Sequence, residues 1–207
     1  MSLSTYAGLK DSIVSWSKNS GSQVLARVDD FIDLAEADIW ERLRIRDMET
    51  TGTASLSTAN RFLALPTGFL ELRNMKITRT NLPDVPLKYQ APINIIVSDS
   101  AGLPDKFTVT SRFEFNCVPD QAYTVEYHYY ASLTALSGSN TTNAVLTRFP
   151  MIYLYGSLFH YANWAMNDAM AAKYGELFLG AIDSANDNDT AGRYGPAPVV
   201  FARRTTP

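Results

Sequence analysis

The sequence predicts an α+β protein in which two pairs of helices flank a segment of short strands. Apolar residues recur at helical spacing before about residue 47 and again after about residue 133. Between them the chain is rich in Thr, Phe, Tyr and Val, with turn residues separating short runs. Neither helix pair is large enough to bury its own apolar face, so we expect the two pairs to form one four-helix bundle. The strand segment is then an insertion that projects from the bundle.

The first helix pair covers residues 1–46. We expect one helix from a cap at Ser4 to Ser17, a break at Lys18–Ser22, and a longer helix from Gln23 to about Ile45. The longer helix carries an apolar stripe at near-heptad spacing. The residues of this stripe are Val24, Val28, Phe31, Ala35, Ile39 and Leu43.

The inserted strand segment covers residues 47–132. Its clearest strands are "KFTVT", "RFEFNCV" and "YTVEYHYYA", and Pro92 favours a short helix in "APINIIVSD". In the last strand, Tyr123, Val125, Tyr127 and Tyr129 alternate onto one face. The opposite face also carries an aromatic residue, so we expect both faces to be at least partly covered.

The second helix pair covers residues 133–187. Its first helix begins near Pro150, and the stretch from Phe149 to Asn167 contains no Asp, Glu, Lys or Arg. This stretch is too short after Pro150, and too polar in its middle, for a membrane span. It is therefore predicted to be the core helix of the bundle, with Gly156 allowing a close approach of its neighbours. A last helix follows at about Ala169–Ala185, and residues 188–207 are expected to form an extended arm.

Composition and motifs give no indication of an enzyme. The net charge of -3 and the pI of about 5.4 provide no basic field to hold nucleic acid. The chain contains no hydrolase, zinc or phosphate-loop motif, so we expect no catalytic residue, no cofactor and no metal. The single cysteine, Cys117, is predicted to be a buried thiol. His128 is expected to be a partly exposed strand residue, and His160 a packed or interface residue.

Two other features constrain location and metal binding. The N-terminus lacks the pattern of a signal peptide, so we expect a protein made in a cytoplasm. The run Asp187–Gly192 resembles the start of a calcium loop, but Ala191 and Pro198 occupy positions where the loop needs oxygen ligands. We therefore expect no calcium site there.

Two groups of residues are candidates for contacts with other proteins. Asp38, Arg42 and Arg46 follow one another at four-residue spacing, which indicates either a solvated helix face with internal ion pairs or a contact surface between subunits. The C-terminal arm is either disordered or ordered only on a partner. Its aromatic and basic residues favour the second interpretation. These residues are Tyr194, Phe201, Arg203 and Arg204.

Several segments, taken in order, resemble one family. They are "VDDFIDLAEADIWERLRIRDME", "LALPTGFLELRNMKI", "YTVEYHYYASLTALS" and "NAVLTRFPMIYLYGSLFHYANWAMND". This succession resembles the head-to-tail adaptor (connector) proteins of tailed bacteriophages, the group that includes tail tubular protein A. The resemblance extends from about Ser4 to Asp187.

The resemblance implies a structural virion protein rather than an enzyme. Such adaptors form a ring, typically of twelve copies, beneath the portal. The ring connects the portal to the tail or nozzle and leaves a channel for double-stranded DNA without sequence-specific binding. The implied fold is a helical bundle with a β-sandwich-like insertion, and the implied location is the neck of a virion assembled in the host cytoplasm. The family's C-terminal arm commonly reaches the portal, which we expect of residues 192–207.

A different class of function remains possible at this point. The inserted domain could be a binding module that recognises a glycan or a peptide, since tyrosine-rich strands suit such a surface. The residues that would carry this recognition are Tyr123, Tyr127, Tyr129 and Tyr130.

Overall fold

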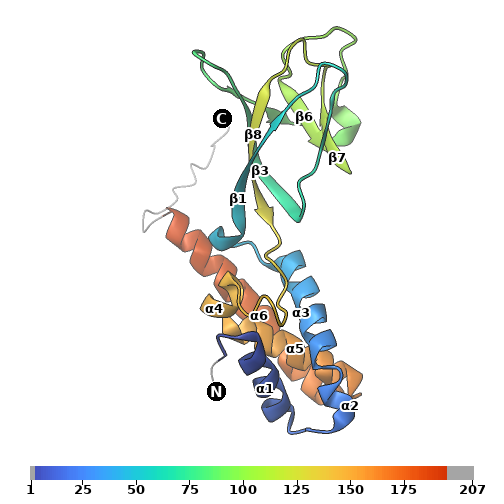
Figure 1. Cartoon of the computed structure of the whole chain (residues 1–207), viewed down its shortest axis with the longest axis vertical. Helices are drawn as coiled ribbons and strands as arrows, with labels where there is room; N and C mark the ends of the chain where they lie inside the picture. Colours follow the sequence, from blue (N-terminus) through green and yellow to red (C-terminus); the bar gives the residue numbers. More distant parts are fainter. Residues whose placement is uncertain (1–2, 195–207) are drawn as a thin grey trace, which may run out of the picture. The chain divides into compact units, whose positions relative to one another are not determined.

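The protein folds into two compact units, seen in a computed structural model that describes residues 3–194. The helical unit joins the residues before Met48 to those after Leu133, and the strand unit is Met48–Leu133. Within the described residues there are six α-helices and two four-stranded sheets (Figure 1). The predicted α+β class is confirmed.

The N-terminal helices are α1 (Tyr6–Ser17), α2 (Ser22–Leu25) and α3 (Val28–Arg42). The cap of α1 is Thr5, whose hydroxyl accepts the Gly8 N–H at 3.2 Å, so the predicted cap at Ser4 is wrong by one residue. The single long helix predicted from Gln23 is also wrong, because the Arg27 N–H bonds to the carbonyl of Val24, three residues back. This tighter turn separates α2 from α3. All six residues of the predicted apolar stripe are nevertheless buried.

The C-terminal helices are α4 (Ala144–Arg148), α5 (Pro150–Trp164) and α6 (Asp168–Tyr194). Helix α5 contacts α1, α3, α4 and α6, and Leu154 and Leu158 on it are fully buried, which confirms the predicted core helix. A Cβ atom at Gly156 would lie 2.9 Å from the Phe178 ring and 3.0 Å from the Ala35 Cβ. The glycine therefore sets the spacing of α3, α5 and α6. Helix α4, which was not predicted, starts where the Asn143 side chain accepts the Leu146 N–H at 2.9 Å.

Helix α6 continues well beyond its predicted end at Ala185, so the start of the extended arm at residue 188 is wrong. Asn186 accepts the Arg44 N–H at 2.9 Å, and Asp189 accepts both the backbone N–H and the guanidinium of Arg46 at 3.1 Å. These contacts give partners to backbone groups that follow the end of α3. The "NDNDTAG" run has low helix propensity, and tertiary contacts outweigh that propensity here.

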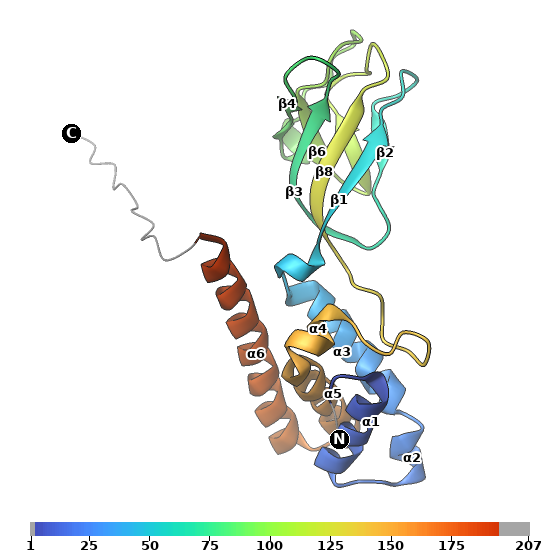
Figure 2. The same cartoon turned by 60° about the vertical axis from the view of Figure 1, so that its left-hand side comes forward.

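The strand unit contains two sheets (Figure 2). The first has the order β1-β8-β3-β4, and all its neighbours are antiparallel. Its strands are β1 (Glu49–Ser55), β8 (Thr124–Ala131), β3 (Phe69–Thr78) and β4 (Val85–Pro86). The second has the order β2-β7-β6-β5, with β5 parallel to β6 and the other pairs antiparallel. Its strands are β2 (Phe62–Ala64), β7 (Arg112–Phe115), β6 (Lys106–Val109) and β5 (Lys88–Tyr89).

One hydrophobic core draws residues from both sheets. It contains Met75 and Val125 from the first sheet and Phe107 and Phe113 from the second. The alternation predicted for β8 is confirmed, because the side chains of its inward face are all buried. On the neighbouring strand β1, Gly52 leaves room for the Tyr127 ring, which a Cβ atom there would meet at 2.4 Å. The short helix predicted at Pro92 is a single 3-10 turn, η2 (Pro92–Asn94). A further 3-10 turn is η1 (Arg46–Met48).

Candidate interaction surfaces of the helical unit

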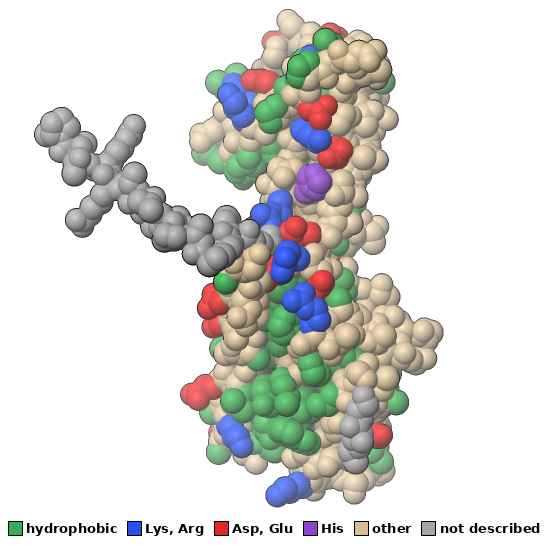
Figure 3. Space-filling model, turned by 90° about the vertical axis from the view of Figure 1, so that its left-hand side faces the viewer, with side chains coloured by type: hydrophobic (Ala, Val, Ile, Leu, Met, Phe, Trp, Pro, Cys, Tyr) green, Lys and Arg blue, Asp and Glu red, His purple; other side chains and the backbone are tan. Residues whose placement is uncertain are grey.

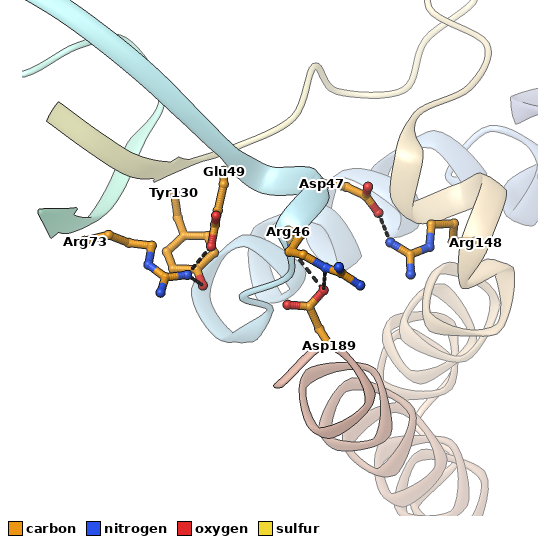
Figure 4. Close-up of polar contacts among 7 residues, drawn as sticks. All are labelled: Arg46, Asp47, Glu49, Arg73, Tyr130, Arg148 and Asp189. Atoms are coloured by element: carbon orange, nitrogen blue, oxygen red, sulfur yellow. Dashed lines mark hydrogen bonds and ion pairs between the residues drawn. The ribbon is translucent and has the colours of Figure 1, made fainter. Parts of the chain in front are cut away.

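The predicted interface residues Asp38, Arg42 and Arg46 do not form one patch. Arg46 is bound to Asp189 within its own chain, as Figure 4 shows, so it contributes mainly to the fold. The Asp38 carboxylate lies 2.9 Å from Nε2 of His160. Arg42 is exposed, and its guanidinium makes no ion pair with any residue in the range 3–194. Arg46 therefore forms an internal ion pair and Asp38 contacts His160, whereas Arg42 is exposed.

Asp38 and Arg42 nevertheless lie at a partly apolar surface formed by α3, α5 and α6. They line a hollow of about 140 Å³ together with Phe159 and Leu179. A larger hollow of about 400 Å³ lies between α3 and α5 and is lined in part by Leu34, His160 and Trp164. We call this surface the groove face. Its residues are Leu34, Asp38, Arg42, His160, Trp164 and Leu179.

The groove face exposes large apolar side chains that a monomer normally buries. Leu34 is 50% exposed, and Trp164 and Leu179 are each 43% exposed. Exposed apolar side chains that line neighbouring hollows, with polar groups such as Asp38 and His160 among them, are typical of a protein contact. The groove face is therefore the first candidate interaction surface.

A second apolar surface is formed by α1, α5 and α6. Trp16 and Met151 are more than two-fifths exposed there, and Leu177 is 39% exposed. The Tyr155 ring lies between those of Trp16 and Tyr174, with centroid separations of 6.3 and 6.2 Å. We call Trp16, Met151, Tyr155, Tyr174 and Leu177 the aromatic face. Hydrophobic side chains also gather on the side of the helical unit that Figure 3 shows.

Helix geometry directs some residues of the two faces to different sides of α5 and α6. On α5, Tyr155 and Trp164 are nine residues apart, which at about 100° per residue is half a turn beyond two full turns. On α6, Leu177 and Leu179 are two residues apart and so differ by about 200°. Each copy of the chain therefore carries two apolar faces that differ in their residues.

The helical unit also contains a buried polar network around Glu36, which sequence reasoning missed. The Glu36 carboxylate is almost fully buried on α3 and accepts the Leu136 N–H at 2.9 Å and the Tyr153 hydroxyl at 2.8 Å. The Tyr153 hydroxyl in turn accepts the Asn143 side-chain amide at 2.6 Å. Burial raises the pKa of Glu36, and burial together with the Glu36 charge raises the pKa of Tyr153. The network fastens the segment before α4 to α3 and α5.

Figure 4 shows two further sets of polar contacts, one in each unit. In the helical unit, Arg148 forms an ion pair with Asp47. In the strand unit, Arg73 forms an ion pair with Glu49 and donates to the Tyr130 hydroxyl at 3.2 Å. These pairs occupy charges within the chain, so they are structural contacts rather than binding sites.

The candidate chemical groups are placed as structural side chains. Cys117 is buried, as predicted, and burial raises the pKa of its thiol, which disfavours the reactive thiolate. His128 is partly exposed, as predicted, and its Nδ1 lies 2.8 Å from the Thr51 hydroxyl. Across residues 3–194, no three His, Cys, Asp or Glu side chains lie close enough together to hold a metal ion.

The predicted arm falls largely beyond the part of the chain that the structure describes. Tyr194 is the last residue of α6, and its side chain is not among those described. Phe201, Arg203 and Arg204 lie outside the described residues. Among the helices of residues 3–194, none combines the length and the apolar character that crossing a bilayer requires.

A comparison with protein-family models gives a match for this chain. The model of the SU10 adaptor protein family matches residues 4–200, nearly the whole sequence, and no curated protein matches. The match agrees with the predicted adaptor, a structural component of a bacteriophage virion, but it does not identify the tail tubular protein A group. The chain belongs to the SU10 adaptor protein family.

Proposed function

We propose that this protein is a head-to-tail adaptor that forms a closed ring beneath the phage portal. The ring, of twelve copies, joins the portal to the tail or nozzle and forms part of the channel through which double-stranded DNA passes. In this proposal the helical unit acts as a four-helix bundle and the strand unit as a sandwich inserted into it. The adaptor assembles in the host cytoplasm and resides in the virion neck.

The observation that carries the proposal is the pair of unlike apolar faces on the helical unit. A ring requires a heterologous contact, in which one patch of each copy meets a different patch of the next. The groove face and the aromatic face provide two such patches. We propose that the aromatic face of one copy packs against the groove face of its neighbour, with Arg42 available for a charge on that neighbour.

The size of these faces favours assembly on the portal rather than in free solution. Completing the burial of a roughly half-exposed apolar side chain contributes about 1 kcal/mol, so the three such side chains on each of the two faces together contribute roughly 6 kcal/mol. The loss of translational and rotational freedom on association costs about 4–15 kcal/mol. Copies held side by side by a portal would avoid much of that cost.

The portal contact is assigned to the C-terminal arm. Tyr194, Phe201, Arg203 and Arg204 combine aromatic and guanidinium groups, which are enriched where proteins bind one another. The Asp189–Arg46 contact fixes the last part of α6 and so gives the arm a firm starting point. Removing residues 192–207 should weaken binding to the portal at least tenfold in light scattering. Unchanged affinity would exclude the arm.

The alternative of a tyrosine-based binding module is not favoured. Tyr123, Tyr127, Tyr129 and Tyr130 are each 8% exposed or less, so their rings are not available to a glycan or peptide.

The net charge of -3 also suits a conduit that must release DNA, because a basic lining would retain it.

Two charge substitutions test the heterologous contact. Leu34→Glu disables the groove face, and Leu177→Glu disables the aromatic face. Leu82→Glu, in the strand unit, is the matched control, because Leu82 is a leucine that is 59% exposed. Each full-length variant is mixed with the portal protein of the same phage, and the mass of the complexes is measured by mass photometry.

The expected results distinguish a ring from a symmetric dimer. Each face variant alone should fail to complete the ring, and the Leu82→Glu control should complete it. A mixture of Leu34→Glu and Leu177→Glu should form pairs of one copy each, since such a pair contains one intact interface. If either variant alone forms dimers as well as the wild type does, the contact is isologous and the ring proposal fails.

A further inference from the structure

The strand unit carries an apolar protrusion that the described residues 3–194 leave exposed. Ile93 is 92% exposed and Ile96 is 81% exposed, and Val97 beside them is 43% exposed. From Tyr89 to Ser98 the chain contains no charged residue. Monomeric proteins seldom expose isoleucine to this extent, and two such residues three positions apart indicate a surface that another molecule covers.

The protrusion is held in place at both ends. At its start, the Gln90 N–H donates to the Phe107 carbonyl at 2.8 Å, and at its end the Ser98 N–H donates to the Asn116 carbonyl at 2.7 Å. Between them, the Asn94 N–H closes the 3-10 turn on Ala91 at 2.8 Å. A surface ordered in advance in this way loses little conformational entropy when it binds.

The same unit carries an apolar hollow of about 350 Å³. Apolar side chains of β3, β5 and β6 dominate its lining. They are Phe69, Leu70, Leu72, Tyr89, Phe107 and Val109. Of the two charged residues at its edge, Arg73 is already paired with Glu49. The exposure of Ile93 and Ile96 shows that they do not fill this hollow in their own copy.

We propose that Ile93 and Ile96 of one copy enter the hollow of the neighbouring copy in the assembled ring. The eight aliphatic carbons of two isoleucine side chains need roughly 200–250 Å³ at the packing density of protein interiors, which the hollow can accommodate. A protrusion and a hollow of the same chemistry on one chain satisfy each other through a repeating heterologous contact. This inference rests on the proposed ring and adds the strand unit to its interface.

The composition of the protrusion favours a second copy over a lipid surface. A lipid-binding loop adds Lys or Arg residues around its apolar tip, whereas the nearest charges here, Lys88 and Asp99, cancel. The apolar area of the tip, on the order of 500 Å², is smaller than a stable isolated dimer needs. The contact should therefore form between copies that the helical units already hold together.

Disulfide cross-linking tests the contact. The full-length double variant Ile96→Cys/Val109→Cys places one thiol on the protrusion and one at the hollow. The two single variants are matched controls, and the native Cys117 is buried. Each protein is assembled with the portal, oxidised, and separated by denaturing electrophoresis without reductant, while mass photometry records whether rings form.

The proposal predicts a ladder of linked chains longer than dimers for the double variant, with no ladder for either single variant. Rings without a ladder would overturn the protrusion contact and leave the ring proposal standing. Absence of both rings and ladder would overturn the protrusion contact and the ring proposal together.

As a second measurement, Ile93→Ser/Ile96→Ser should weaken ring assembly at least tenfold. Normal rings that fail to bind later tail proteins would instead assign the protrusion to those proteins and contradict the proposal.

Discussion

Gly156 provides a sharp test of how the helical unit is packed. A Cβ atom at this position would lie 2.9 Å from Cε2 of Phe178 and 3.0 Å from the Ala35 Cβ. Carbon atoms in good contact are about 3.5–4.0 Å apart, so Gly156→Ala forces a displacement of about 0.5–1 Å. The Phe178 ring is buried, and the Ala35 Cβ is attached directly to the α3 backbone, so neither can move freely.

The expected change in stability has two opposing parts. Overpacking a core by one methyl group costs about 1–3 kcal/mol. Replacing a helical glycine by alanine contributes about 1 kcal/mol in the opposite direction. Gly156→Ala should therefore lower the free energy of unfolding by up to about 2 kcal/mol. Gly180→Ala is the matched control, because Gly180 lies in α6 with open space where a Cβ atom would project, and it should raise stability by about 1 kcal/mol.

Urea denaturation followed by circular dichroism measures both variants. The Gly156→Ala and Gly180→Ala midpoints should lie on opposite sides of the wild-type midpoint. In an Ala35→Gly background, the cost of Gly156→Ala should fall, since one of the two close contacts is gone. If Gly156→Ala is as stable as Gly180→Ala, the close packing of α3, α5 and α6 around Gly156 is incorrect.

Three further predictions concern single residues. Burial raises the pKa of Glu36 above its ordinary value of 4.5, so the folded state binds the carboxyl proton more tightly than the unfolded state does. The stability that this proton contributes is present below about pH 4.5 and is lost as the pH rises through the raised pKa. In the Glu36→Gln variant, the urea midpoint should depend less on pH over that range. A pH dependence equal to that of the wild type would contradict this. Met166 is exposed and has a φ of 53°, in the left-handed region that a side chain disfavours. Met166→Gly should therefore raise the free energy of unfolding by about 1 kcal/mol, measured by thermal unfolding. A lower Tm for this variant would contradict the presence of backbone strain at Met166. Asp189→Ala should lower the free energy of unfolding by about 1–3 kcal/mol, because it leaves the Arg46 N–H without its acceptor. Hydrogen exchange at the Arg46 amide should become faster in this variant. An unchanged exchange rate would show that the contact is unimportant.

The core of the helical unit was predictable because it follows from periodicity. The apolar stripe of α3 and the uncharged α5 both appear in the sequence as patterns of side chains, and burial follows directly from such patterns. The close approach at Gly156 was likewise expected from its small size. In β8 the alternation of two faces gave the inward residues, although it did not indicate which strands would pair with them.

Other features depended on contacts between residues far apart in sequence. The extension of α6 to Tyr194 runs against the local propensity of its Asn and Asp residues, and it requires the backbone of Arg44 and Arg46 as a partner. The Glu36–Tyr153 contact spans 117 positions, so no local pattern could reveal it.

The candidate site was only partly predictable for the same reason. Four-residue spacing grouped Asp38, Arg42 and Arg46, but the chain bends after Arg42 and turns Arg46 toward Asp189. The exposed apolar residues of the groove and aromatic faces could have been found from the sequence as apolar positions that lie outside the core-facing stripe of their helix. Leu34 in α3 is one such position.

The measurement that tests the central claim most directly is the mass of the complex formed by the full-length protein and the portal protein of the same phage. Mass photometry at micromolar concentration should show one discrete species, in which a ring of twelve adaptor copies is bound to the portal. The Leu34→Glu variant should not complete that species. A protein that leaves the portal mass unchanged, or adds copies without a fixed upper number, would contradict the account of a closed adaptor ring.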